Sequence, residues 1–147
     1  MIACALAAGC AGGALEETVV NVRPREPMAP VAYGDCAEAN RRAAAEPDLV
    51  VDSVPRAVTQ RPAPFAGMPD SVWQQIRIKG SSLKVNVLVD TLGRPVMKTF
   101  AVVESSHAWL TQNIRASMPT WRFRAARLAG CKVPRIYRFS ATYKPRR

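Results

Sequence analysis

Histidine is almost absent from this sequence. Only one, His107, occurs among 147 residues, and the four cysteines include no C-x-x-C pair. Zinc sites and most histidine-based catalytic arrays need several such side chains at close spacing, so both are poorly supported. No uncharged apolar run reaches the roughly 18 residues that a membrane-spanning helix requires. No phosphate-binding loop, nucleophile–base pair or paired carboxylates stand out, so we expect a protein that is not an enzyme and uses no metal or cofactor.

Acidic side chains are scarce in the second half of the chain. Residues 71–147 hold two carboxylates, Asp90 and Glu104, against fifteen lysines and arginines, whereas residues 1–70 hold nine acidic and six basic side chains. A field of this kind attracts acidic partners and weakens as salt is added. Nucleic acid, anionic lipid head groups and acidic peptides all fit it, and so does a solubilising surface without a partner. The charge therefore indicates that a partner would be acidic, but it does not identify the partner.

The first fifteen residues carry no charge and consist mostly of small apolar side chains. This composition is typical of a secretory signal and predicts export. Leu6-Ala7-Ala8-Gly9-Cys10 resembles a bacterial lipobox, which implies a signal region over residues 1–10 and a lipid on Cys10. Plain cleavage nearby and a retained apolar N-terminus are the alternatives. Export favours the periplasm, with attachment to a membrane through the lipid, and disfavours nucleic acid as a partner.

Export also decides how the remaining cysteines are interpreted. Cys4 would be lost with the signal, which leaves Cys36 and Cys131 in an oxidising compartment. An even remainder there favours a disulfide, with two free buried thiols as the alternative. Such a bond would tie the proline-rich segment to the rest of the chain and restrict the unfolded state.

Proline is concentrated in residues 22–70, which hold eight of the twelve prolines. Because proline fixes φ and removes a backbone donor, this stretch should be extended and should not form a sheet or a long helix. A short helix is predicted within it at 37–46, which is rich in alanine and ends at Pro47. We therefore assign residues 11–51 to a partly disordered linker and residues 52–147 to a folded domain.

The domain contains a predicted β-hairpin. Residues 82–90 alternate apolar and polar side chains, and residues 96–104 are rich in β-branched and aromatic side chains. Gly93 lies between them, where a turn needs a residue that tolerates positive φ. The apolar face of the first strand should lie against a core.

A helix and a last strand complete the prediction. Ser105 or Ser106 is a credible N-cap, and apolar residues then recur every four positions until Pro119 ends the helix. In the last strand, 133–144, aromatic side chains share one face. The order strand, strand, helix, strand predicts an α+β fold in which one helix packs on a small antiparallel sheet.

In order and spacing, these elements resemble the C-terminal domain of TonB-type energy transducers. The motifs that carry the resemblance are Val85-Asn86-Val87-Leu88-Val89-Asp90, Gly93-Arg94, Val102-Val103, Ser105-Ser106, Trp121-Arg122-Phe123, Gly130 and Val133. The resemblance covers about residues 52–147. Where the family has Pro-Ala after Trp-x-Phe, this chain has Arg124-Ala125. A lipoprotein-like signal stands where a TonB transducer has a membrane-spanning helix.

The resemblance implies a non-enzymatic periplasmic domain that serves transmembrane transport. It would dock an extended segment of an outer-membrane transporter, or of another envelope protein, by adding it as a strand to an exposed sheet edge. The expected edge is formed by Arg135, Ile136, Tyr137, Arg138, Phe139 and Ser140. The alternatives are that a homodimer mate or the linker covers this edge. A second hypothesis is an electrostatic binder of anionic envelope polymers or lipid head groups, whose affinity falls steeply with salt.

Overall fold

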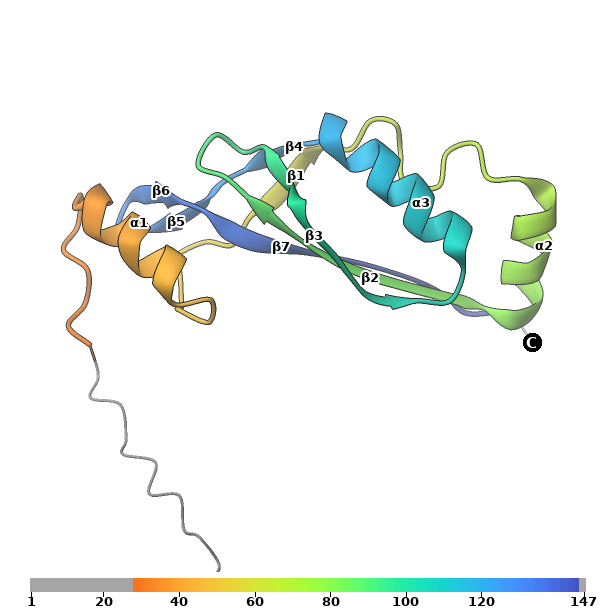
Figure 1. The fold of residues 1–147 in the computed structure, drawn as a ribbon, viewed down its shortest axis with the longest axis horizontal. Helices are drawn as coiled ribbons and strands as arrows, with labels where there is room; N and C mark the ends of the chain where they lie inside the picture. The colour runs from red at the N-terminus through yellow and green to blue at the C-terminus, as the bar shows by residue number, and fades with distance from the viewer. Residues whose placement is uncertain (1–27, 146–147) are drawn as a thin grey trace, which may run out of the picture.

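A computed structural model describes residues 28–145 of the chain (Figure 1). In chain order the elements are α1 (Cys36–Ala45), β1 (Arg56–Thr59), α2 (Asp70–Lys79), β2 (Ser81–Val89), β3 (Pro95–Ser105), α3 (Ala108–Ser117), the short 3-10 helix η1 (Met118–Thr120), β4 (Arg122–Arg124), β5 (Ala126–Leu128), β6 (Cys131–Val133) and β7 (Arg135–Tyr143). All strand pairs are antiparallel, so the predicted α+β class is confirmed. The expected signal region, with Cys10, lies outside the described residues.

The largest sheet has three strands in the order β3-β2-β7, and the predicted hairpin of β2 and β3 is confirmed. The apolar side chains of β2 alternate as expected, and its Leu83, Val85 and Val87 are buried. The turn of the hairpin lies against β4, where the Phe123 amide donates to the Gly93 carbonyl oxygen at 2.9 Å. A Cβ on Gly93 would lie 2.0 Å from the Phe123 carbonyl oxygen, and its φ is +76°, so this position requires glycine.

Helix α3 lies across one side of this sheet (Figure 1) and buries Leu110 and Ile114 in its core. The predicted serine cap is wrong: the N-cap is His107, whose Nδ1 accepts a hydrogen bond from the Trp109 amide at 3.1 Å. Ser106 is engaged elsewhere, because its hydroxyl oxygen accepts from the Ser82 amide at 3.0 Å. The helix therefore starts later than the serines suggest.

The expectation of a single packed helix is also wrong, because α2 covers the end of the same core. Its Val72 and Ile76 are buried there together with side chains of β2 and α3. Trp121 and Phe123 are buried between these elements, while β4 pairs with β1. Helix α2 was not predicted because its amphipathic pattern begins directly after the last proline of the proline-rich stretch.

The predicted last strand, 133–144, begins two residues later than expected, after Pro134. Val133 instead ends β6, which forms a small hairpin with β5, while β7 pairs with β2 along all nine residues. Proline has no N–H to donate to a ladder, so the break between the two strands falls there. Side chains of Tyr137, Phe139 and Tyr143 share the inner face, as predicted.

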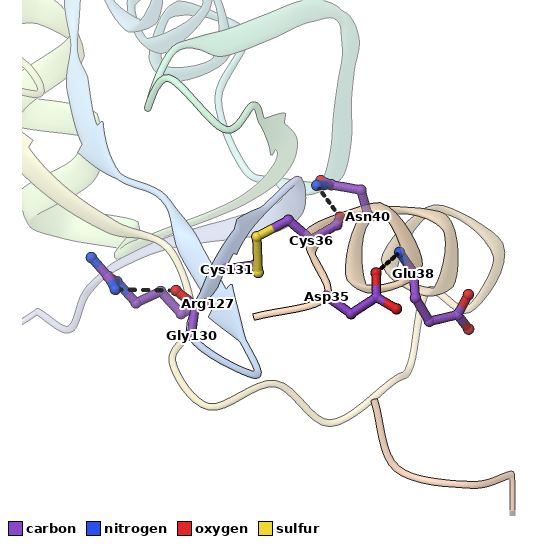
Figure 2. Close-up of a disulfide and its surroundings, with 7 residues drawn as sticks. All are labelled: Asp35, Cys36, Glu38, Asn40, Arg127, Gly130 and Cys131. Atoms are coloured by element: carbon purple, nitrogen blue, oxygen red, sulfur yellow. Dashed lines mark hydrogen bonds between the residues drawn. A yellow bond between two sulfur atoms is a disulfide. The ribbon is translucent and has the colours of Figure 1, made fainter. Parts of the chain in front are cut away.

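A second, smaller core forms around α1. Its buried members are Ala39, Ala43, Ala126, Leu128, Cys131 and Val133. Figure 2 shows the disulfide between Cys36 and Cys131, whose Cα atoms are 5.3 Å apart. The Gly34 amide also donates to the Ala129 carbonyl oxygen at 2.9 Å. The α1 helix lies within one residue of its predicted position, and the packed part of the chain begins before residue 52.

Candidate functional site

Strand β7 is an edge strand. It pairs with β2 on one side, from Arg135 opposite Val89 to Tyr143 opposite Ser81. Within residues 28–145, no backbone hydrogen bond joins the other side of β7 to another segment. We call this unpaired side the β7 edge. Unpaired backbone groups along an extended strand are a template for adding another strand.

The inner face of β7 is fixed by aromatic contacts. The ring centroids of Tyr137 and Phe123 are 4.8 Å apart, and those of Phe139 and Trp121 are 5.7 Å apart. Burial raises the pKa of Tyr137 above its usual value, against a smaller opposite effect of a hydrogen bond with Gln60. These contacts pack the inner face of β7 against the buried side chains of the sheet.

The outer face carries Ile136, Arg138 and Ser140, and all three side chains are exposed. Together with the inner-facing pair Tyr137 and Phe139, these are five of the six residues expected at the binding edge. Alternate side chains of an edge strand point to opposite faces, so an added strand would contact both groups. The structure therefore brings these five residues together on one strand.

Arg135, the sixth expected residue, has a different place. Its side chain is buried, and its guanidinium donates to the carbonyl oxygens of Ala43 at 3.1 Å and Glu46 at 2.7 Å, as well as to that of Leu49. These carbonyl groups lie at and after the C-terminal end of α1, where a cation is favourable. Arg135 therefore joins α1 to the start of β7, and its side chain is not part of the exposed outer face.

A segment of the expected linker borders the first half of β7. Residues 47–54 and the outer side of β7 line a shallow notch, with Val50, Val54 and Ile136 exposed around it. Asp48 and Arg138 lie at the same notch. Sequence reasoning missed this surface, although the valine-rich run between two prolines was a signal of it.

The two carboxylates of the basic half are both engaged in local contacts. The Glu104 carboxylate lies 2.6 Å from Lys84 Nζ, and the hydrogen bond from this lysine lowers the pKa of Glu104 below its usual value. Asp90 Oδ1 accepts hydrogen bonds from the backbone amides of Leu92 and Arg94 in the hairpin turn. Neither group is directed at Arg138, so a partner carboxylate could approach this arginine without competition from them.

The serine and histidine side chains before α3 lack the geometry of a nucleophile and its base. The Ser105 hydroxyl donates to the His107 carbonyl oxygen at 3.1 Å, and it accepts from the Thr111 hydroxyl at 2.7 Å. The imidazole is used as the helix cap. Between residues 28 and 145, no three potential ligands of the His, Cys, Asp or Glu type gather as a metal site would need, and no helix is both long and apolar enough to cross a membrane.

Comparisons with known proteins show a similarity in structure and none in family model or curated sequence. No family model matches the sequence, and no curated protein matches it. Among solved structures, the chain is similar to the solution NMR structure of the TonB C-terminal domain from Pseudomonas aeruginosa, with 24% sequence identity and a TM-score of 0.43. The similarity covers 65% of this chain and 91% of that domain.

Proposed function

We propose that this chain is a periplasmic interaction domain that docks an extended peptide segment along the β7 edge. The single observation that supports this most directly is that, among residues 28–145, β7 pairs with β2 alone and its other side has no backbone partner, while its inner face is anchored by Tyr137 and Phe139. In strand addition, backbone hydrogen bonds supply affinity and alternate side chains supply selectivity. The segment would come from an outer-membrane transporter or another envelope protein, as the resemblance to TonB C-terminal domains implies.

The partner segment should be apolar with acidic residues nearby. Arg138 is exposed on the outer face of β7, and the valines of the adjoining notch lie beside it. An opposite charge on the partner would speed association and fix its register, more than it would add to affinity. We further propose that a lipid on Cys10 tethers the domain to a membrane, so that docking takes place close to its surface.

The test is an NMR titration of the full chain with peptides from the N-terminal segments of outer-membrane transporters, at low and at high salt. Saturable shifts confined to β7 and its neighbours at both salt concentrations are expected. Shifts that spread over the basic surface and vanish at high salt would instead support the electrostatic binder of anionic polymers or lipid head groups.

Two charge-reversal variants make the test specific. Arg138→Glu should weaken docking of an acidic peptide about tenfold at low salt, because a like charge would then face the peptide carboxylate. Lys132→Glu is the matched control, since Lys132 is also exposed but lies on β6, away from the edge. Equal weakening by both variants would show that binding depends on the net charge of the protein and not on the β7 edge.

A further inference from the structure

A pocket lies at the far end of β7, on the inner face of the sheet. Its volume is about 180 Å³. Besides Ser81 and the last three residues of β7, its lining consists of Phe65, Met68, Trp73, Ile76 and Leu110. Ile76 and Leu110 also belong to the sheet core, which places the pocket on the inner face. An apolar cavity of about 150 Å³ binds benzene, so this pocket can accept one leucine or phenylalanine side chain.

The inner face of β7 borders this pocket. The ring centroids of Phe65 and Phe139 are 6.4 Å apart, so the middle of the strand is covered by an aromatic contact. The rings of Trp73 and Tyr143, with centroids 5.4 Å apart, cover its last residue in the same way. Between these two contacts lies Ala141, a small inward-facing side chain that is only partly buried. The pocket therefore lies beside Ala141, where β7 contributes no ring to the inner face.

The pocket is also close to the β7 edge. Thr142 lines it too, although the side chain of this residue alternates to the outer face. Directly opposite residues of neighbouring strands point to the same face, with Cβ atoms about 4.5–5.5 Å apart. A strand added at the β7 edge would therefore direct its residue opposite Ala141 inward. At that separation, a long or aromatic side chain can reach the pocket.

A second recognition point, Arg138, lies on the opposite face of the strand. Its side chain is exposed, and within residues 28–145 it takes part in no ion pair. Arg138 and Ala141 are three positions apart, and an odd spacing along a strand places two side chains on opposite faces. The two residues of an added strand that lie opposite them would also be three positions apart, one directed inward and the other outward.

We propose that the β7 edge selects segments in which a leucine or phenylalanine is three residues away from a carboxylate. The apolar side chain would fill the pocket beside Ala141, and the carboxylate would pair with Arg138. This inference rests on the proposed function, because it needs a strand at the β7 edge. Burial of the apolar side chain should strengthen binding about tenfold to a hundredfold. The exposed ion pair should add less affinity and mainly fix the register.

The test is an NMR titration of the full chain with synthetic peptides that share a scaffold of threonine and serine. One peptide carries leucine and glutamate three positions apart, and a second carries them in reverse order, since an added strand can run in either direction. In the better of the two orders, replacing leucine by alanine should weaken binding about tenfold. Moving glutamate to a spacing of two should weaken it about threefold at low salt, because both side chains then lie on one face.

Two variants of the protein locate the effect at the pocket. Ala141→Leu adds bulk beside the pocket, so the preference for leucine over alanine should fall from about tenfold to less than about twofold. Ser140→Leu is the matched control, because it adds similar bulk on the exposed outer face of the same strand and should keep the preference. In the parent chain, nuclear Overhauser effects should join the peptide leucine methyls to Met68 and Trp73, a readout that needs no substitution.

The outcomes separate this inference from the proposed function. If peptides bind along β7 without a preference for leucine or for the spacing of three, or if no Overhauser effect reaches Met68 and Trp73, the pocket is overturned and the docking function stands. Equal loss of the preference in Ala141→Leu and Ser140→Leu would also overturn the pocket. If neither the synthetic nor the transporter-derived peptides bind at β7, the docking function fails as well.

Discussion

The two packed regions of this chain are stabilised in different ways. The sheet core buries large side chains, among them Trp121, Leu83 and Ile114, between β2 and the helices α2 and α3. The α1 core consists mainly of small side chains, three of them alanines. Hydrophobic stabilisation grows with the apolar area removed from water, so the α1 core gains much less from burial.

Where little apolar area is buried, a covalent bond and a few specific hydrogen bonds hold the structure together. The α1 region is fastened by the disulfide between Cys36 and Cys131 and by the buried guanidinium of Arg135. Packing in the sheet core is spread over many contacts, so one substitution removes only part of its stabilisation. The disulfide or the Arg135 hydrogen bonds, in contrast, are lost completely in one substitution, and the disulfide also by reduction. We therefore expect that weakening the sheet core lowers the stability of the whole folded part, whereas removing the disulfide or the Arg135 hydrogen bonds destabilises only α1 and the segments that contact it.

The largest effect is expected from Trp121→Ala. Trp121 is fully buried and contacts the rings of Phe123 and Phe139, so its truncation should lower the free energy of unfolding by about 3–5 kcal/mol. Urea unfolding followed by circular dichroism measures this loss. Helix α1 and the sheet should unfold together in this variant.

Trp121→Phe is the control for this prediction. The indole Nε1 of Trp121 has no hydrogen-bond partner among the described residues, so the phenylalanine sacrifices no such bond and keeps most of the ring. Its loss should be well under half that of alanine. Equal losses in the two variants would mean that the buried volume at this position is not what stabilises the sheet core.

The next effect is that of the double substitution Cys36→Ala/Cys131→Ala. Removing a cross-link between residues 95 positions apart should cost about 2–4 kcal/mol, since the unfolded chain is no longer restricted. Native-state hydrogen exchange should show α1 opening locally while the amides of β2 remain protected. If α1 and β2 lost protection to the same extent, the two regions would form one cooperative unit and the comparison would fail.

Sequence reasoning found the elements whose patterns are local and missed those that depend on distant contacts. The alternation of β2, the turn at Gly93 and the aromatic face of β7 follow from periodicity and turn chemistry, and the structure has them. The cap at His107 could not be read from the sequence, because Ser106 is drawn to the Ser82 amide, 24 residues away. Long-range competition of this kind overrides local capping preference.

The candidate site shows the same division. The exposed Ile136, Arg138 and Ser140 follow from strand alternation once β7 is known to be a half-buried strand. Arg135 lies on the inward side of the same alternation, but its partners could not be predicted locally, because they are the carbonyl groups at the end of α1, 86 to 92 residues earlier. A basic residue in a basic strand gives no local sign that it serves as a helix cap.

A smaller loss of stability is expected from Arg135→Met, which tests whether this arginine fastens α1 or binds a partner. Methionine keeps much of the apolar stem but leaves the carbonyl oxygens of Ala43 and Glu46 without their donor. Unpaired buried acceptors should cost about 1–3 kcal/mol, measured by urea unfolding. Docked peptide should still bind at β7, because the side chain of Arg135 faces α1.

Arg138→Met is the matched control. Together the two variants test whether stability and peptide binding depend on different arginines of β7. Arg138 is exposed, so its replacement should change the free energy of unfolding by less than about 0.5 kcal/mol while weakening the binding of an acidic peptide. Two neighbouring arginines of one strand would then have opposite roles, one in stability and one in binding. If Arg135→Met left stability unchanged and abolished peptide binding, α1 would not depend on this tie, and Arg135 would belong to the docking surface.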